Sequence, residues 1–201
     1  MSEHWNDVYA KKPAHEVSRF QRDPEVSVRL IEQTRGSIVD VGAGASVLVD
    51  RLMASGRTDL TLLDVSETAL NATRRRLGNL ATQIDFVADD VCRWQPDRSF
   101  DCWHDRATFH FLTTSTDQHA YVATATAHIN PSGALVLGCF ASDGPTQCSD
   151  LPTARYEASD LADIFSHGFT LEHSEKETHE TPWSAPQQFT WVILRRKNAV
   201  T

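Results

Sequence analysis

The chain has 201 residues, and its 19 lysines and arginines against 27 aspartates and glutamates give a formal net charge of -8 at pH 7. This length suffices for one domain with a shared hydrophobic core. The acidic balance disfavours a nucleic-acid partner, because the average field repels phosphates. We therefore expect a single domain over residues 1–201, with an N-terminal helical lid in residues 1–35 and the core in residues 36–201.

The cysteines and the N-terminal residues indicate the compartment. The four cysteines form no CxxC pair and have no spacing typical of a zinc site. No signal-peptide-like apolar run is present at the N-terminus, and nowhere do about 18 apolar residues follow one another. We expect a soluble cytoplasmic protein with reduced thiols, no metal, no membrane contact and no obligate partner.

The first half of the chain alternates between buried strands and helices. Residues 37–41 form a continuous apolar run closed by glycines, which is typical of a strand buried on both faces. A helix is predicted over 47–54 and a second strand over 60–64. Ser66 is expected to cap the next helix, which Gly78 ends.

The alternation continues to about residue 166 and then changes. Strands are predicted over 84–88, 100–104 and 134–140, and helices over about 117–129 and 158–166. Residues 169–175 and 189–195 then indicate two strands joined by a polar loop. The prediction is an α/β fold: a Rossmann-like three-layer sandwich whose seven-stranded, mostly parallel sheet ends in an antiparallel hairpin. This arrangement resembles the class I methyltransferase sheet rather than a six-stranded dinucleotide-binding sheet.

The most informative motif is Val-Asp-Val-Gly-Ala-Gly-Ala-Ser at residues 39–46. Its glycines allow a tight turn and close approach to a ligand, although a turn without a ligand has the same pattern. The motif resembles Asp-x-Gly-x-Gly-x-Gly of the class I S-adenosylmethionine-dependent methyltransferases, with Ser46 in place of the third glycine. The resemblance implies that Asp40 approaches the methionine amino group, and that Gly42 and Gly44 lie against the methionyl and ribose parts.

Two further acidic positions follow strands. Asp64 ends the second strand 24 residues after Asp40, where a carboxylate can accept hydrogen bonds from two ribose hydroxyls, as in NAD enzymes. Val65, the next residue, is also predicted to contact the cofactor. The Asp-Asp-Val segment at 89–91 resembles the adenine-recognition segment of methyltransferases. This resemblance assigns Asp90 to the exocyclic amine and Val91 to backbone and packing contact, with S-adenosyl-L-methionine as cofactor. Each aspartate alone also fits a simple turn or helix cap.

The candidate catalytic residues follow the fourth strand, in residues 103–112. The Trp-His-Asp-Arg-Ala segment there resembles one of small bacterial methyltransferases and the Trp-Asp-Arg-Gly-Ala stretch of thiopurine methyltransferase-like enzymes. Our interpretation makes His104 or His110 the proton acceptor, Arg106 the electrostatic support and Asp105 the orienting group. Alternatively, Asp105 and Arg106 pair to fix the loop. If the strand continues, alternation prevents three successive side chains from entering one pocket.

The acceptor pocket is expected to draw on both halves of the chain. The resemblance to small bacterial methyltransferases covers nearly all of it, including residues 18–21, 130–133 and 148–152. The candidate pocket residues are Trp5, Tyr9, Phe20, Gln21, Phe109, Arg155 and Tyr156. The first four fit an aromatic lid that excludes water, or a helix packed on the sheet.

The predicted function is methyl transfer from S-adenosylmethionine to a small-molecule acceptor, with a thiol preferred. The alternative within this class is N-methylation of protein lysine or a small amine. A different class, the NAD-dependent oxidoreductases, would also use Gly42, Gly44 and Asp64 and predicts a sixth parallel strand. A non-catalytic cofactor-binding protein is the third alternative.

Overall fold

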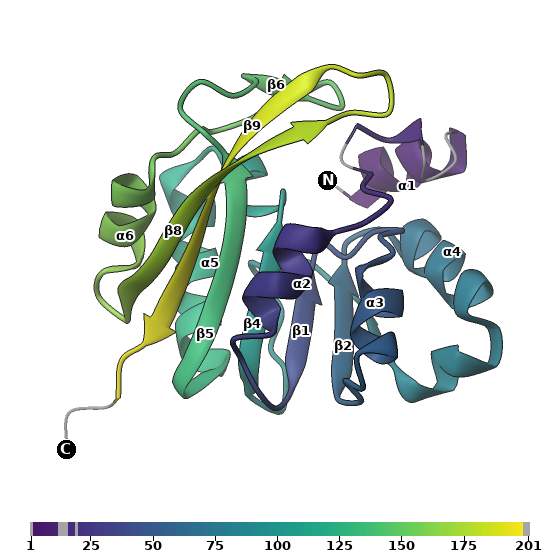
Figure 1. The fold of residues 1–201 in the computed structure, drawn as a ribbon, viewed down its shortest axis with the longest axis horizontal. Helices are drawn as coiled ribbons and strands as arrows, with labels where there is room; N and C mark the ends of the chain where they lie inside the picture. The colour runs from purple at the N-terminus through teal and green to yellow at the C-terminus, as the bar shows by residue number, and fades with distance from the viewer. Residues whose placement is uncertain (1, 12–15, 19, 199–201) are drawn as a thin grey trace.

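The computed structural model describes residues 2–11, 16–18 and 20–198. Arg19, in the 18–21 segment that carries part of the resemblance, lies outside the described residues. A seven-stranded sheet forms the centre of the molecule (Figure 1). Its strands, in the order β3-β2-β1-β4-β5-β9-β8, are Asp85–Ala88, Leu60–Asp64, Ile38–Val41, Phe100–Arg106, Ile129–Phe140, Pro186–Arg196 and Phe169–Glu180.

The sheet has the predicted mixed topology. Strands β1 to β5 pair in parallel, whereas β9 is antiparallel to both β5 and β8. The short strands β6 (Gln147–Cys148) and β7 (Leu151–Pro152) pair separately. The prediction of a Rossmann-like sandwich with a terminal hairpin is therefore confirmed.

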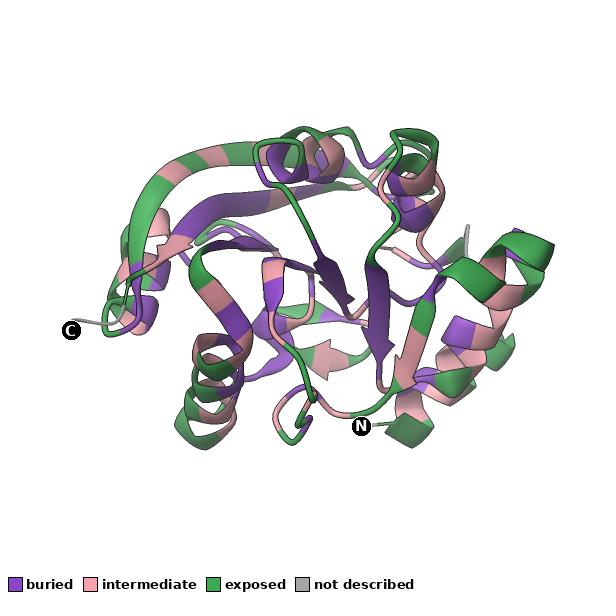
Figure 2. Cartoon of the chain, turned by 90° about the horizontal axis from the view of Figure 1, so that it is seen from below, coloured by how far each residue is buried: buried purple, intermediate pink, exposed green. Residues whose placement is uncertain are grey.

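Helices cover both faces of the sheet, so its central strands are buried (Figure 2). One core cluster includes side chains of α2 (Glu25–Ile31), α3 (Leu48–Ala54) and α4 (Glu67–Leu77). The other includes side chains of α5 (Ser115–His128) and α6 (Ala158–Phe165). Helix α1 (Ser2–Lys11) contacts α4, and the 3-10 helices are η2 (Gly78–Gln83) and η3 (Phe109–Phe111). In the described part of the chain, no helix is long and apolar enough to cross a membrane.

Local sequence signals explain the bounds of α4. The Ser66 hydroxyl accepts a hydrogen bond from the Ala69 amide at 3.2 Å, which is the predicted N-cap. Gly78 ends the helix with φ of 56°, a conformation that a side chain disfavours.

Several predicted bounds are wrong by a few residues. Strand β4 continues to Arg106, because its pairing with β5 extends to Gly138. Strand β8 continues to Glu180, because its pairing with β9 reaches Pro186. Polar residues on the exposed edge strand β8 conceal this length from a search for apolar runs.

Candidate functional site

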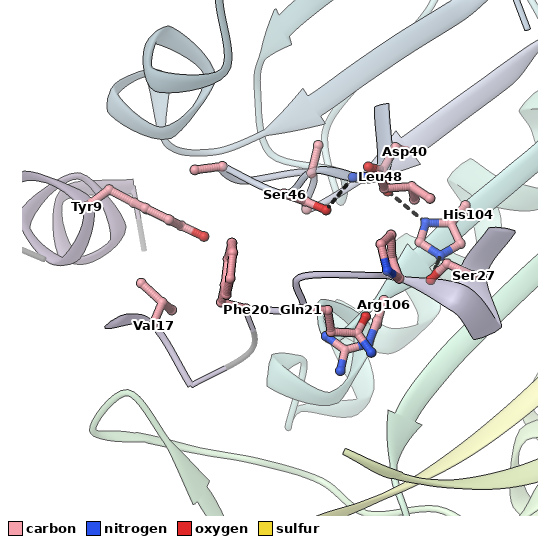
Figure 3. A pocket seen from close by; sticks show the side chains of 14 residues that line it. Tyr9, Val17, Phe20, Gln21, Ser27, Asp40, Ser46, Leu48, His104 and Arg106 are labelled. Carbon is pink, nitrogen blue, oxygen red and sulfur yellow. Dashed lines mark hydrogen bonds and ion pairs between the residues drawn. The ribbon is translucent and has the colours of Figure 1, made fainter. Parts of the chain in front are cut away.

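The candidate site lies where the carboxyl ends of β1, β2 and β4 meet. Strand order reverses between β1 and β4, the position at which open α/β sheets leave a ligand crevice. Two adjoining pockets occupy it, and Tyr9 and Gly42 line both. We call one the Asp64 pocket, lined also by Trp5, Asp64, Val65, Asp90, Val91 and Thr108. The other is the Arg106 pocket, lined also by Phe20, Gln21, Ser27, Asp40, His104 and Arg106 (Figure 3).

The first glycine of the motif is required by a protein side chain. Gly42 has φ of 67°, and a Cβ there would lie 1.7 Å from the Thr108 hydroxyl oxygen. Thr108 Oγ1 donates to the Val41 carbonyl at 3.3 Å. The end of β4 therefore packs directly on the glycine turn, so the turn is shaped by the fold as well as suited to a ligand.

The second glycine lies under the N-terminal helix. A Cβ at Gly44 would lie 2.4 Å from the Tyr9 hydroxyl oxygen. The Gly44 amide donates to Asp64 Oδ2 at 2.8 Å, and Thr73 Oγ1 donates to the Gly44 carbonyl at 3.2 Å. The loop is thus covered by α1 and tied to β2 and α4.

Asp64 is held in a fixed orientation at the wall of its pocket. Besides the Gly44 amide, the Ser66 amide donates to its Oδ1 at 2.7 Å. The residue is only 8% exposed. A buried carboxylate that two backbone amides orient is suited to accept further hydrogen bonds from paired hydroxyls.

The Asp-Asp-Val segment both makes a turn contact and lines a pocket. Asp90 Oδ1 accepts from the Cys92 amide at 3.0 Å, which is a turn contact. Asp90 and Val91 also line the Asp64 pocket. Capping and pocket lining are therefore not alternatives at this position.

Asp40, His104 and Ser27 form a buried hydrogen-bonded chain (Figure 3). His104 Nδ1 lies 2.7 Å from Asp40 Oδ1, and its Nε2 lies 3.0 Å from Ser27 Oγ. The three residues are 4%, 2% and 1% exposed. Because both ring nitrogens are engaged inside the protein, His104 is not placed to take a proton from an acceptor. The proton-acceptor role predicted for it is wrong in this geometry.

Asp105 points to the opposite face of β4, as strand alternation requires. Its carboxylate accepts from the amides of Thr108 at 2.9 Å and Phe109 at 3.1 Å, and from the Tyr121 hydroxyl at 2.7 Å. Burial raises the pKa of Asp105 to about 7. Asp105 fixes the turn at Ala107, whose φ is 68°. Its predicted role beside a catalytic base is therefore wrong.

Four other residues predicted to be catalytic or to line the acceptor pocket lie in neither pocket. His110 is fully buried, its Nδ1 accepts from the Phe140 amide at 3.2 Å, and its ring stacks on Phe140, so it is not an acceptor-facing base. Phe109 is buried among aromatic rings, and the Tyr156 hydroxyl accepts from Gln118. Arg155 is exposed after β7. Their place in the sequence after β4 and β5 suggested the pocket, but their side chains pack elsewhere.

Arg106 lies on the pocket face of β4. Its guanidinium carbon is 4.6 Å from the centre of the Phe189 ring. Among the described residues that line the Arg106 pocket, it alone carries a permanent positive charge. Burial, and next the nearby Arg106 charge, lower the pKa of His179 on β8. The positive potential at this wall is consistent with an anionic ligand.

Helix α1 brings Trp5 and Tyr9, two residues of the predicted lid, to the Asp64 pocket. Trp5 is 5% exposed and meets the Phe111 ring edge to face, with centroids 5.2 Å apart. Asn6 Oδ1 accepts from Ser66 Oγ at 2.9 Å and from the Thr68 amide at 3.2 Å. Phe20 and Gln21 reach the neighbouring pocket.

Residues that the sequence analysis did not single out complete the site. They are Ser27 on α2, Thr108 after β4, Asn6 on α1 and Glu177 on β8, which accepts from Gln21 Nε2 at 2.8 Å. No motif or spacing marks them, because their partners are distant in the chain.

The terminal hairpin distinguishes this sheet from the dinucleotide-binding sheet of NAD-dependent enzymes, whose glycine loop is similar to that of methyltransferases. Antiparallel β9 occupies the position where a dinucleotide-binding sheet would carry a sixth parallel strand. Residues 38–133 match a family model described as a methyltransferase domain. Residues 38–133 are therefore similar to a methyltransferase domain, and the sheet around them has the class I methyltransferase fold.

Sequence and structure comparisons give similar proteins of this kind. The ribosomal RNA small subunit methyltransferase C of Salmonella arizonae is 35% identical over 109 residues, which cover 53% of this chain and 32% of that protein. The chain thus spans about a third of the length of this curated relative. A solved structure described as "Conversion of a Disulfide Bond into a Thioacetal Group during Echinomycin Biosynthesis" has a TM-score of 0.78 and 21% identity, covering 100% of this chain and 94% of that one.

Two further structures share the methyltransferase fold. The 1,6-didemethyltoxoflavin-N1-methyltransferase of Burkholderia thailandensis, solved with S-adenosylhomocysteine, has a TM-score of 0.72 and 20% identity, covering 98% of this chain and 84% of that one. The N-methyltransferase NodS of Bradyrhizobium japonicum WM9, with the same ligand, has a TM-score of 0.74 and 15% identity, covering 97% and 100%.

Proposed function

We propose that this methyltransferase moves the methyl group of S-adenosylmethionine to a small-molecule acceptor that reacts as an anion, with a thiolate preferred. The observation that carries the cofactor assignment is the pair of adjoining pockets that share Tyr9 and Gly42. An elongated ligand with a nucleoside at one end and an amino acid at the other fits two adjoining pockets.

The chain's residues would divide the cofactor between them. Asp64 would accept from the ribose hydroxyls, and Asp90 and Val91 would contact the adenine. Asp40 would attract the methionyl ammonium group. Trp5 and Tyr9, in the proposed lid of residues 1–35, would exclude water from the nucleoside.

The anionic acceptor follows from the residues around the second pocket. In methyl transfer, a lone pair of the acceptor forms the bond to the methyl carbon, while the carbon–sulfur bond breaks and leaves a neutral thioether. His104 and Asp105 are engaged inside the protein, and His110 lies outside the pocket. None of these three groups is therefore placed to remove a proton from the acceptor. The Arg106 guanidinium, which lines the pocket, can stabilise the negative charge of an acceptor that has already lost its proton. A thiol, whose pKa is near 8.5, meets this requirement more readily than an ammonium group.

Calorimetry with S-adenosylhomocysteine and NADH tests the cofactor. We expect S-adenosylhomocysteine to bind and Asp64→Ala to weaken it by about 1–3 kcal/mol, because ribose hydroxyls lose a charged partner. Asp85→Ala, an exposed residue on β3, is the control and should bind like the parent protein. Tighter binding of NADH would overturn the cofactor assignment.

Methyl transfer from labelled cofactor to thiols, phenols, carboxylates and amines tests the acceptor. We expect Arg106→Met to lower turnover of thiols about 100-fold, as loss of a charge-stabilising group does, with a smaller effect on cofactor affinity. Transfer to amines but to no thiol would contradict the proposed acceptor. Absence of transfer to every class, with normal cofactor binding, would favour a non-catalytic binding protein.

A further inference from the structure

The buried chain Asp40–His104–Ser27 contains a histidine that the proposed chemistry does not use. We propose that His104 is a positioning residue that orients Asp40 toward the amino group of the cofactor, with Ser27 fixing the histidine ring. This inference rests on the proposed function, because it requires that the Arg106 pocket accept the amino-acid end of S-adenosylmethionine.

The sheet register brings the first two members together. Asp40 on β1 is the direct neighbour of His104 on β4 in the parallel pairing. Their side chains therefore project from the same face, at the pocket floor. The 2.7 Å contact uses Oδ1 of Asp40. Since a carboxylate accepts, the proton of this bond lies on His104 Nδ1.

The other ring nitrogen is fixed from a different layer. Ser27 on α2 lies 3.0 Å from Nε2, and it is 1% exposed. The Trp191 ring packs beside the imidazole, with centroids 6.0 Å apart and planes inclined by 31°. Rotation of the imidazole would break two buried hydrogen bonds, so the ring and the carboxylate are held as a unit.

The order serine, histidine, aspartate is also that of a hydrolase triad, but the burial argues against this use. A nucleophilic serine must meet the substrate, but Ser27, although it belongs to the lining of the Arg106 pocket, is only 1% exposed. Asp40, in contrast, adjoins the glycine turn that both pockets share. The chain therefore ends on the carboxylate, where a cationic group of the ligand is expected.

Three substitutions of His104 separate its two contacts. His104→Asn places an amide near Nδ1 and can keep the donor to Asp40, whereas His104→Gln places its amide near Nε2 and keeps only the contact with Ser27. His104→Phe keeps the ring and loses both contacts. Calorimetry uses S-adenosylhomocysteine, which has the amino group, and 5′-methylthioadenosine, which lacks the amino-acid part. Thermal unfolding confirms that each variant is folded.

We expect His104→Phe and His104→Gln to bind S-adenosylhomocysteine at least about tenfold more weakly, because the charged Asp40 carboxylate loses the hydrogen bond that His104 Nδ1 donates to it. His104→Asn should retain most of the affinity, and 5′-methylthioadenosine should bind all variants within about twofold of the parent protein. Equal losses for both ligands would overturn the positioning role, because they would indicate general distortion. A loss in His104→Asn as large as in His104→Phe would also overturn it. If the parent protein binds neither ligand, the proposed function fails instead.

Discussion

Asp105 shows how one residue shapes the site without entering it. It lies on the far side of β4 from His104 and Arg106, and its carboxylate binds two amides of the turn that follows. Tyr121 donates to it and in turn accepts from Trp103 Nε1 at 3.0 Å. These bonds hold Thr108 against the glycine turn, so the shape of both pockets depends on a group that neither contains.

The raised pKa of Asp105 predicts a pH-dependent stability. The group titrates near 3.8 when exposed, and burial raises its pKa to about 7 in the fold. Between these values the folded protein holds the proton more tightly than the unfolded chain, so this group's contribution to stability falls as pH rises from about 4 to about 7. We expect the stability advantage of the parent protein over Asp105→Asn to shrink across that range, measured by urea unfolding at several pH values. Parallel curves for the two proteins would contradict this expectation.

At the residue scale, the sequence predicted which residues lie at the candidate site better than it predicted which contacts they make. The placement of Asp64, Asp90 and Val91 at one pocket follows from strand ends that meet at one edge, which spacing alone predicts. The roles of His104 and His110 depended on partners from α2 and β5, and no local pattern reveals these. Alternation along β4 correctly limited how many of its residues reach the pocket.

Among the elements, α1 has the most consequential position. Figure 1 shows it beside α4, away from the body of the sheet. Its Asn6 satisfies the Thr68 amide, one of the N–H groups that the first turn of α4 cannot pair within the helix. The same first turn follows Asp64, so the proposed lid docks directly beside the proposed ribose-binding carboxylate.

We expect Asn6→Ala to loosen α1 without unfolding the core. A helix of ten residues is marginal alone, so loss of this docking contact should increase amide hydrogen exchange across α1. Binding of S-adenosylhomocysteine should weaken, since Trp5 and Tyr9 line the pocket. The change in unfolding free energy should be about 1 kcal/mol or less.

Hydrogen exchange measured by mass spectrometry checks this expectation. Asn6→Asp keeps an oxygen acceptor near the α4 N-terminus, where negative charge is favourable, and should exchange like the parent protein. Unchanged protection of α1 in Asn6→Ala would show that packing alone holds the helix.

The element pattern itself was largely predictable. Continuous apolar runs identified β1 and β2 because both faces of these strands are buried. The exposed edge strand β8 was recognised but cut short, since its alternating polar residues give a weaker signal. The short pair β6 and β7 was not predicted, because two-residue strands have no periodicity.

At the scale of the molecule, the C-terminal ribbon of β8 and β9 extends toward the N-terminal part of the chain (Figure 1) and contacts it at Ser18 and Gln21. His179 Nε2 donates to the Ser18 carbonyl at 2.9 Å. Glu177 accepts from Gln21 at 2.8 Å and from Trp191 Nε1 at 2.7 Å. The Glu177 carboxylate thus links Gln21, which lines the Arg106 pocket, to the Trp191 ring, which packs beside His104.

We expect Glu177→Ala to lower the unfolding free energy by about 1–3 kcal/mol, because the buried Trp191 N–H loses its acceptor. Residues 16–18, 20 and 21 should also become more susceptible to exchange. The matched control is Glu172→Ala on the same strand, whose exposed pair with Arg195 should contribute about 1 kcal/mol or less. Urea unfolding measures both variants, and equal effects would contradict a special role for Glu177.

The contacts between the two ends of the chain also determine the order in which the site is completed during translation. Every residue that lines either pocket has been synthesised once Leu112 has left the ribosome. The groups that support Ser18 and Gln21 are added more than 60 residues later, in β8. A nascent chain therefore possesses the full lining of its ligand crevice before it possesses the ribbon that holds one side of that crevice in place.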